Sequence, residues 1–578
     1  MVNNVSVETK RIDTDVLVIG GGSAGLFAAI RAMDFCPKVT LVDKGIVASA
    51  GISTFIHVVT APVPEEDIGL AMKESVEHST YLCDQPRLQV MLTEIGERVR
   101  EADSWGVPFE RDGSGKLYTA KRMGQKFTSC VFVEGREMIL AMKRKALSKG
   151  VEFVERVMIT DLLTSDGQHP TSGQVVGAVG LHTISGHFYV FKAKVVIIAS
   201  GLVGAKLHLH YADNVTGDGH AMALRAGCEL QGMETDWAPA FSVWNRTFST
   251  GGQAEYMRAG AKVINKLRDG IIERYASDKE APSLSRVELC QAAAKEVLEG
   301  RGPVYLDMTH LKEEDIERMR RVLPIAMRAF DDAGIDLLKQ QVEITPIFYN
   351  WLGGIRANHN GESAVNGLYA VGASAHRGNN SGFVGVPQAY GFVFGYRAGE
   401  AAGKLASNMA EINMDTEQAR TLQRQLFQPL EQTTGPRPSH IYRLIHKVTV
   451  PLEFSVFKHE KRINITLAEV QRVLEEELAG VRAVDVHDLV KANEARNFVP
   501  LSEAFYRCAL ERKESRFSHY REDYPYRDDV DWLKWVIVKR GQKGLSVRTE
   551  PIQFEEAPAK PEHRLRVPVS IRISLEQK

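Results

Sequence analysis

A glycine-rich turn near the amino end restricts the fold of this chain more than any other feature. The apolar run Val16–Ile19 leads directly into Gly20-Gly-Gly22-Ser-Ala-Gly25, and a second apolar run, Val39–Val42, ends at Asp43. In a strand–turn–helix–strand unit with this spacing, the first glycine allows a tight turn. The second lets a pyrophosphate approach the backbone, and the third lets the helix pack on the sheet. The pattern therefore predicts a dinucleotide-binding α/β domain.

The positions after the turn add to this prediction. The amino terminus of the helix would face the phosphates, and Asp43 lies 18 residues after Gly25, close to the place of the acid that binds a ribose. A plain glycine turn in an α/β domain is the alternative. The residues expected to contact the dinucleotide in this unit are Gly20, Gly22, Ser23, Ala24, Gly25, Asp43 and Lys44.

Length, charge and cysteine spacing exclude several classes of protein. A chain of 578 residues predicts about two to four domains. The net charge of -1 provides no basic field for nucleic acid or an acidic membrane. Six cysteines without a CxxC pair argue against a metal site or iron–sulfur cluster within the chain. The polar start and the absence of a membrane-length apolar run predict a cytoplasmic protein without direct membrane insertion.

Periodicity predicts the elements that follow the turn. Helices are expected near Asp67–Ser79, Arg87–Trp105 and Arg136–Lys149. The segments Gln174–Leu181 and His187–Ala199 alternate or run apolar, as the two strands of a hairpin do.

Residues 236–350 have a different character from the segments around them. They combine aromatic loops with charged helices expected at Ser285–Glu299 and Lys312–Ala333. Residues 365–405 then return to a strand, a glycine and a helix, and need the first domain's sheet to join. The insertion is therefore expected to form a lid over a cleft at the carboxyl ends of the strands. The predicted domains are 1–235 plus 351–405 for cofactor binding, 236–350 as the cap, 406–540 as a helical domain, and 541–578 as a tail that is irregular or wraps a partner.

Further glycine-bearing strand ends favour FAD over NAD. A buried run ends at Ala199 and Gly201, Thr216-Gly-Asp218-Gly219 precedes a helix, and another strand ends at Gly372. A helix that starts at Val386-Pro387 would aim its positive end at what precedes it. Several such ends fit one long cofactor across a sheet better than unrelated capped turns, which remain the alternative.

Taken in order, these motifs resemble those of the flavoprotein subunits of succinate dehydrogenase, fumarate reductase and adenylylsulfate reductase, the FAD-binding type 2 superfamily. The segment Glu514–Trp532 resembles the equivalent segment of succinate dehydrogenase. The resemblance covers nearly the whole chain. It implies an α/β fold with a Rossmann-like FAD-binding domain, an inserted α+β capping domain and a C-terminal helical domain. It also implies a small-molecule substrate and, as the partner, an iron–sulfur, ferredoxin-like electron-transfer subunit.

The resemblance implies how FAD is held. The histidine that binds FAD covalently in succinate dehydrogenase falls near Gly51 in this chain, so the FAD is expected to be non-covalent. The other positions expected to bind the cofactor are Gly51, Ser53, Ala199, Gly201, Asp218, Gly372 and Val386.

The resemblance also identifies a candidate proton donor in the insertion. Arg286 falls on the arginine that donates the proton in fumarate reductases. An arginine serves this role only where burial and carboxylates make deprotonation accessible, because the pKa of a free guanidinium is too high. A solvated arginine at a helix start is the alternative.

The dicarboxylate clamp of that family is not retained. Its cap histidine is absent from Asp236–Phe241, its second histidine falls near Tyr349 and Trp351, and its arginine stretch reads Asn379–Val386. Losing two imidazoles and a guanidinium removes most of the donors that would hold two carboxylates. These changes argue against succinate or fumarate as the substrate.

Other residues are candidates for a divergent substrate site. The pair His376-Arg377 resembles the polar pair near the flavin in adenylylsulfate reductase and makes both residues catalytic candidates. His57, Trp237, Tyr349 and Trp351 are candidates for a substrate pocket. A polar loop, a satisfied structural histidine and plain aromatic core are the alternatives.

The main functional hypothesis is an FAD-dependent oxidoreductase that moves a hydride between flavin N5 and a small organic substrate and exchanges electrons with an iron–sulfur partner. An adenylylsulfate-reductase-like enzyme that acts at sulfur is one alternative. A non-catalytic flavoprotein that only relays electrons is another.

Overall fold

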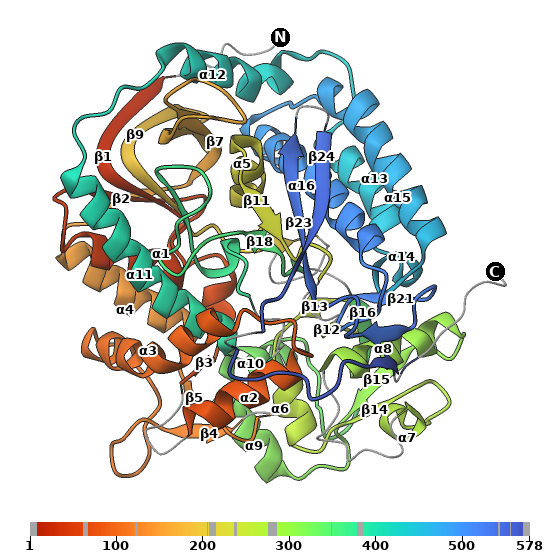
Figure 1. The fold of residues 1–578 in the computed structure, drawn as a ribbon. Coiled ribbons are helices and arrows are strands. Elements are labelled where there is room, and N and C mark those ends of the chain that lie inside the picture. Colours follow the sequence, from red (N-terminus) through yellow and green to blue (C-terminus); the bar gives the residue numbers. More distant parts are fainter. Residues whose placement is uncertain are drawn as a thin grey trace.

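The computed structural model describes residues 8–61, 67–121, 125–204, 206, 215–235, 240–275, 286–347, 350–378, 383, 385–541, 544–554, 557–569 and 571. The chain folds around one large sheet (Figure 1). Its strand order is β6-β2-β1-β9-β8-β7, with β19 also paired to β9. The bounds of these strands are β1 Thr9–Ile19, β2 Val39–Asp43, β6 Glu152–Glu155, β7 Val157–Thr164, β8 Val175–His182, β9 Phe188–Ile198 and β19 Leu368–Ala370.

The strands that meet the glycine turn run parallel. Strand β1 pairs in parallel with β2 and β9, and β9 pairs in parallel with β19. The hairpin of β8 and β9 confirms the strands expected at Gln174–Leu181 and His187–Ala199. Because the carboxyl ends of β1, β2, β9 and β19 share one edge, that edge is where a ligand is expected in such a sheet.

Alternation along β1 builds a core on each face of the sheet. Val16 and Val18 join the cluster formed with helices α1 (Ser23–Ala32), α3 (Gln85–Ser104), α4 (Gly135–Ser148) and α11 (Val386–Asn408). Leu17 and Ile19 join the opposite cluster, formed with α5 (Asp218–Ala226) and α16 (Val486–Glu511). Alternate residues of β1 are thus buried on opposite faces, as is typical of a sheet covered by helices on each side.

The helices expected after the first unit are confirmed to within two residues. They are α2 (Ile68–His78), α3 and α4. The side chain of Asp67 caps α2 by accepting from Gly69 N at 2.7 Å, and the side chain of Asp84 caps α3 by accepting from Arg87 N at 3.1 Å. Short polar caps of this kind are readable from sequence. A three-stranded sheet beside them contains β3 (Val58–Thr60), β5 (Ser129–Phe132) and β4 (Thr119–Lys121).

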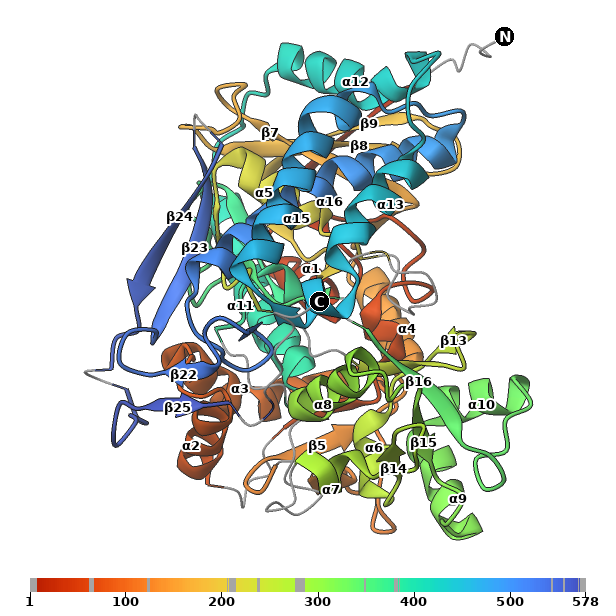
Figure 2. The same cartoon turned by 90° about the vertical axis from the view of Figure 1, so that its right-hand side faces the viewer.

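The insertion has its own sheet and core, which lie below the central sheet in Figure 2. The core includes Trp244, Tyr256, Phe330 and Leu306. Its strands, in sheet order, are β13 (Phe248–Ser249), β12 (Ala240–Trp244), β16 (Val342–Ile347), β15 (Val304–Asp307) and β14 (Lys262–Ile264). Its helices are α6 (Gln253–Arg258), α7 (Ile271–Tyr275), α8 (Arg286–Leu298), α9 (Glu313–Val322) and α10 (Pro324–Asp332).

The single helix predicted over Lys312–Ala333 is wrong. The chain forms α9 and then α10, with a break at Leu323. Pro324 follows that break at the start of α10. A proline has no N–H to donate and disfavours a helical conformation in the residue before it, so it ends one helix and begins the next.

The C-terminal part begins with helices and ends in strands. The longer helices are α12 (Thr416–Glu431), α13 (Pro438–Thr449), α15 (Glu460–Arg472) and α16, and a short α14 spans Leu452–Ser455. The hairpin of β23 (Lys534–Gly541) and β24 (Gly544–Pro551) then joins β11 (Glu229–Gln231) and β18 (Gly354–Ile355) in one sheet.

The boundary expected between residues 540 and 541 therefore falls inside this hairpin, and β24 belongs to the segment expected to be a tail. Farther along, β25 (Arg566–Pro568) pairs with β22 (Tyr526–Asp528). Two further strand pairs are β10 (Val203–Gly204) with β17 (Asn350–Trp351), and β20 (Phe457–Lys458) with β21 (Tyr520–Arg521).

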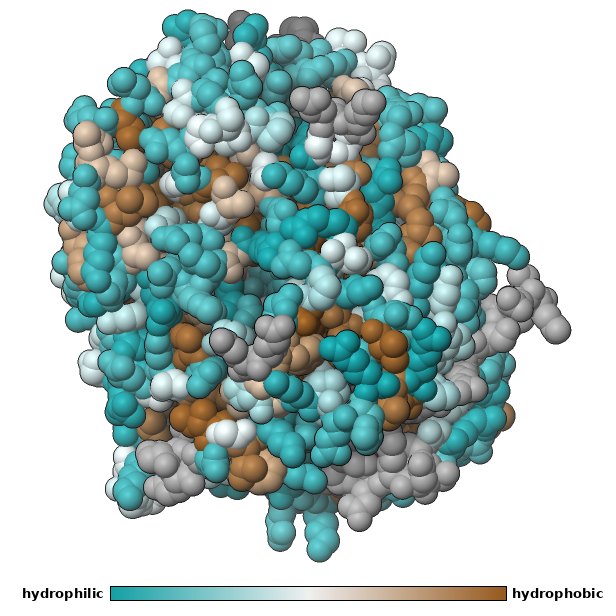
Figure 3. Space-filling model, in the orientation of Figure 1, coloured by the Kyte–Doolittle hydropathy of each residue, from teal (hydrophilic) through white to brown (hydrophobic). Residues whose placement is uncertain are grey.

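The surface in view is mostly polar. Figure 3 shows hydrophilic residues over most of this face, with apolar residues in separate patches. Across the described ranges, no helix has the length and hydropathy required to cross a membrane.

Candidate cofactor and substrate site

A cavity of about 460 Å³ lies at the carboxyl ends of the parallel strands. It brings together residues that are far apart in the sequence. The residues expected to bind the cofactor that line it are Gly20, Gly22, Ser23, Ala24, Asp43, Lys44, Gly51, Ser53, Ala199, Gly201, Asp218 and Gly372. Gly25 and Val386 do not line the cavity, whereas their neighbours Ala24, Gly385 and Pro387 do.

Two glycines of the turn are required by close backbone contacts. A Cβ on Gly20, which has a φ of +113°, would lie 2.4 Å from the carbonyl oxygen of Ala199. A Cβ on Gly25 would lie 1.9 Å from the carbonyl oxygen of Gly20. The close approach of Gly20 to Ala199 brings the ends of β1 and β9 together. The close approach of Gly25 to Gly20 packs α1 against the end of β1. The packing role that the motif predicts for its third glycine is thus visible in the geometry.

The residues after β2 set the charge at one end of the cavity. The Asp43 carboxylate accepts hydrogen bonds from Gly21 N at 2.7 Å and Gly45 N at 2.8 Å. Burial raises the pKa of this carboxyl, and the two hydrogen bonds oppose the rise. A carboxylate placed here beside the glycine turn is suited to accept hydrogen bonds from ribose hydroxyls.

Lys44 ties three elements together beside the cavity. Its Nζ lies 3.0 Å from Asp218 Oδ2 on α5 and 2.5 Å from Glu494 Oε1 on α16. Burial alone would lower the pKa of Lys44, but the two carboxylates outweigh burial and leave the pKa above its ordinary value. Lys44 is therefore charged, and Glu494 is a site residue that sequence reasoning missed because no local motif marks it.

The amino terminus of α11 forms another wall. Gly385, Pro387 and Gln388 line the cavity, and Ser23 Oγ donates to Gln388 Oε1 at 2.7 Å. This contact joins the amino-terminal turns of α1 and α11. Both helix termini therefore direct positive dipole ends toward the same space. Gln388 was also missed, although it directly follows the Val386-Pro387 signal.

These residues fit a long cofactor that carries a pyrophosphate. The backbone at Gly20 and Gly22 forms a cradle that side chains would fill, because a Cβ on Gly22 would lie 3.2 Å from Ser53 Oγ. Helix termini on two sides favour negative charge. Asp43 and Lys44 provide polar groups at the end of β2.

Arg377 and His57 are the catalytic and pocket candidates that line this cavity. Arg377 is 6% exposed, and burial lowers its pKa to about 10. A lowered pKa moves a guanidinium toward the range in which it exchanges protons, although Arg377 remains charged at neutral pH.

The placement of His376 differs from the expectation that it acts at the cofactor. It lines a second cavity, with Arg87 and Trp535. Its Nδ1 accepts a hydrogen bond from Gly378 N at 3.2 Å. Burial, assisted by neighbouring arginines, lowers its pKa to about 3, so the ring is neutral at physiological pH. Consecutive residues 376 and 377 thus face two different cavities.

The other substrate candidates are placed as follows. Trp351 is 2% exposed and stacks on Phe505 with ring centroids 4.7 Å apart, so its position is that of core rather than pocket. Trp237 and Tyr349 lie outside the described residues. Arg286 is the first residue of α8, and its side chain is not among those described.

A buried ion network extends from the cavity into the core. Asn497 donates to Asp218 Oδ1 at 2.8 Å and accepts from Arg225 at 2.8 Å. Arg225 and Arg496 each lie 2.9 Å from the Asp161 carboxylate, which is fully buried on β7. Burial alone would raise the pKa of Asp161, but the two guanidinium groups outweigh it and leave the pKa below its ordinary value.

We therefore expect Asp161 to make the protein sensitive to acid. A carboxyl group whose pKa is lower in the folded state contributes stability above its unfolded pKa and loses it as the pH falls below about 4. Denaturant unfolding at pH 7 and at pH 3 should show that Asp161→Asn loses less stability between the two values than the wild type, by about 1 kcal/mol. Equal losses in the two proteins would contradict this assignment.

Comparison with known proteins agrees with this geometry. A family model described as FAD binding domain matches residues 15–389, and one described as fumarate reductase flavoprotein C-term matches residues 447–566. A relative named as one of the subunits of the fumarate reductase (CoM/CoB) of Methanothermobacter marburgensis is 27% identical over 564 residues, which cover 92% of this chain and 98% of the relative. The succinate dehydrogenase flavoprotein subunit of Rickettsia bellii is 26% identical, with 92% and 94% covered.

A solved structure matches the fold over nearly the whole chain. A mutant form of the E. coli quinol fumarate reductase FrdA has a TM-score of 0.86 and is 23% identical. The match covers 95% of this chain and 99% of that chain. At this identity the similarity concerns the arrangement of the elements.

Proposed function

This chain belongs to the FAD-binding family of fumarate reductase and succinate dehydrogenase flavoprotein subunits, and we propose that it moves a hydride between bound FAD and a small organic substrate. As a member it is an FAD-dependent oxidoreductase. The observation that supports the proposal is that one cavity is lined by the glycine turn, by Asp43 and by the candidates Arg377 and His57. When bound, FAD supplies the hydride chemistry, and the protein supplies orientation and electrostatics.

The binding of FAD is proposed to be non-covalent and divided among the walls of the cavity. The amino terminus of α1, at Gly22 and Ser23, would face the pyrophosphate, and Asp43 would accept hydrogen bonds from the ribose. The amino terminus of α11 would stabilise negative charge on the bound cofactor. Gly51 lines the cavity and carries no side chain that could attach to the cofactor.

We extend the proposal to an iron–sulfur electron partner. The two relatives are themselves named as subunits, which supports a further chain in the working assembly. The spacing of the six cysteines in this chain provides no cluster-binding pattern of its own.

The proton at the substrate carbon is proposed to come from Arg286, with Arg377 orienting the substrate as a charged donor. Both arginines would act in a site from which a closed cap excludes water. The substrate is proposed to be other than succinate or fumarate, because the sequence lacks two imidazoles and a guanidinium of the dicarboxylate clamp.

We expect Arg286→Ala to abolish turnover while FAD stays bound. The FAD-loaded chain would be screened against enoates and cyclic ketones with reduced viologen as the electron donor, and against aromatic alcohols with an oxidised dye as the electron acceptor. The variant would then be tested on the substrate found. Loss of general acid catalysis predicts a rate about 10²–10⁴-fold lower. Arg246→Ala is the matched control, since Arg246 is also in the insertion, is 74% exposed and pairs with Glu343.

Unchanged turnover in Arg286→Ala would remove that residue from the mechanism. Failure of every organic substrate, together with a sulfite adduct that bleaches the flavin spectrum, would replace the proposal with chemistry at sulfur. If neither turnover of an organic substrate nor a sulfite adduct is observed, the non-catalytic electron-relay role would remain.

A further inference from the structure

A second cavity, of about 220 Å³, lies beyond residues 376–378 from the cofactor cavity. Its walls come from the start of α3, from β11, from the segment after β18 and from the hairpin of β23 and β24. Its charged and polar lining residues are Asp84, Arg87, Gln231, Arg356, His376 and Glu550. Neither the cofactor motif nor the proposed chemistry uses this cavity.

Arg87 is the unusual group in this lining. It is 4% exposed. Its Nη1 donates to the carbonyl oxygen of Ala357 at 2.6 Å, and its guanidinium lies 4.5 Å from the ring centre of Phe394. Within the part of the chain that the structure describes, no carboxylate forms an ion pair with Arg87, and its buried Nε has no acceptor. A buried charge without a partner is costly, and such groups are normally paired.

Arg98, on the same helix, is a comparable buried arginine whose charge is balanced by ion pairs. It is also 4% exposed and lies over an aromatic ring, that of Tyr396 at 3.7 Å. Its Nε also lacks an acceptor, but in contrast to Arg87 it forms ion pairs with Glu97 and with Glu101, the latter at 2.7 Å. The fold therefore neutralises one of two similar arginines and leaves the other without a counter-ion of its own.

The remaining charges of the cavity do not supply that counter-ion. Glu550 is held by Arg356, with Nη2 and Oε1 2.6 Å apart, and by Arg548 at 2.9 Å. The Asp84 carboxylate accepts from the backbone N of Arg87, as the cap of α3. Both carboxylates are thus hydrogen-bonded to other donors. Burial lowers the pKa of Arg87, and the nearby charge of Asp84 opposes that shift without cancelling it.

His376 contributes a second unused donor. Its Nδ1 accepts from Gly378 N, so the proton of the neutral ring is on Nε2. That Nε2 is buried beside the backbone of Gly232 and has no acceptor among the described residues, so it adds an uncompensated polar group to the wall of the cavity. The neutral ring at this position, near Arg87 and Arg356, agrees with a locally positive environment.

We propose that the second cavity binds a small oxyanion, a phosphate or a small carboxylate, held by Arg87. A guanidinium and an oxyanion form charge-assisted hydrogen bonds that are stronger than neutral ones. The anion would supply the missing counter-charge for Arg87. Because Arg377 follows His376 directly and lines the cofactor cavity, occupation of the site is expected to perturb the flavin spectrum. The site does not depend on which substrate the flavin serves.

The test is calorimetric titration of the FAD-loaded full chain with inorganic phosphate, with acetate in a second arm to distinguish phosphate from carboxylate. The wild type should bind one anion per chain. Arg87→Gln should weaken binding at least about tenfold, whereas Arg98→Gln should leave it unchanged and Arg87→Lys should retain most of it. A dissociation constant for Arg87→Gln equal to that of the wild type would overturn the proposal.

A second measurement covers the case in which Arg87→Gln fails to fold. The Tm of the wild-type holoprotein would be compared in phosphate, acetate and chloride at equal ionic strength. A ligand that binds only the folded state raises the Tm, so a rise in phosphate or acetate over chloride is expected. No rise in either, together with no calorimetric signal, would also overturn the proposal.

Discussion

Replacing Gly20 with valine is expected to abolish FAD binding. The Cβ of any residue at this position would lie 2.4 Å from Ala199 O and 2.7 Å from Ala199 C. Both neighbours are backbone atoms at the end of β9, so neither can rotate away. The φ of +113° adds strain of about 1–3 kcal/mol for a non-glycine residue. The ends of β1 and β9 must separate, and both line the cofactor cavity.

The measurement is the FAD content per chain after desalting, from visible absorbance. The wild type should retain FAD, and Gly20→Val should retain less than about a tenth as much, since a loss of about 1.4 kcal/mol already lowers affinity tenfold. Gly113→Val is the matched control, because a Cβ at Gly113 would meet no atom within 4 Å. Full FAD occupancy in Gly20→Val would show that the turn tolerates the separation.

Much of the fold was predictable because its signals are local. The glycine turn, the caps Asp67 and Asp84 and the apolar runs of β1 and β9 each lie within a few residues of the element they define. Even the break before Pro324 had a local signal, since a proline inside a charged amphipathic run indicates a helix boundary. The prediction of a single helix followed the amphipathic pattern and did not take that proline as a boundary.

The C-terminal hairpin was missed for a different reason. Strand β23 pairs on one side with β24, but on the other with β11, at Glu229–Gln231. That partner lies about three hundred residues earlier in the sequence, and no local pattern in residues 534–551 indicates it. Pairing over such a distance depends on the completed tertiary fold.

The candidate site divides in the same way. Candidate cofactor-binding residues such as Gly22 and Asp43 are predictable because they lie at set distances from one turn. The direction of a side chain in an irregular segment is not, so Arg377 lines the cofactor cavity while His376 lines the second one. The ion pair of Lys44 with Glu494 joins residues 450 positions apart and has no signature at either end.

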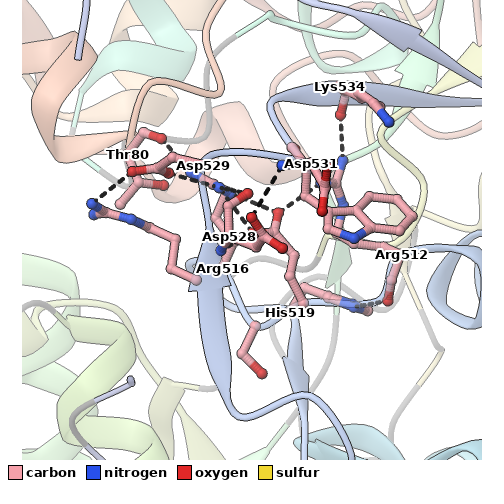
Figure 4. Close-up of polar contacts among 12 residues, drawn as sticks. Thr80, Arg512, Arg516, His519, Asp528, Asp529, Asp531 and Lys534 are labelled. Carbon is pink, nitrogen blue, oxygen red and sulfur yellow. Dashed lines mark hydrogen bonds and ion pairs between the residues drawn. The ribbon is translucent and has the colours of Figure 1, made fainter. Parts of the chain in front are cut away.

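The other large expected effect concerns a buried ion network near the root of the insertion. Figure 4 shows Arg512 and Arg516 among the carboxylates and carbonyls that they contact. Arg512 Nε lies 2.9 Å from Glu234 Oε1, and its Nη1 lies 2.8 Å from Glu514 Oε1. All three side chains are fully buried. Glu234 follows β11 and lies two residues before the start of the insertion at residue 236, so this contact ties the end of α16 to that point.

We expect Arg512→Met to lower the free energy of unfolding by about 3–5 kcal/mol, the usual cost of stranding one partner of a buried pair. Glu514 keeps Arg516 as an ion-pair partner at 2.7 Å, but Glu234 keeps no ion pair within the described ranges. Burial already raises the pKa of Glu234, and Arg512 opposes that rise. In the variant, Glu234 is expected to take up a proton, so the loss of stability should be larger at pH 8 than at pH 5.

Urea unfolding at both pH values measures this effect. Arg320→Met is the matched control, because Arg320 also bridges two carboxylates, Glu317 and Asp331, but is 39% exposed and both of its partners are exposed as well. Exposed pairs contribute about 0–1 kcal/mol, so the control should remain close to the wild type. A loss below about 1 kcal/mol in Arg512→Met, or one that does not change with pH, would mean that water or rearrangement compensates Glu234. In that case the ion pairs of Arg512 with Glu234 and Glu514 would not be what stabilises the start of the insertion.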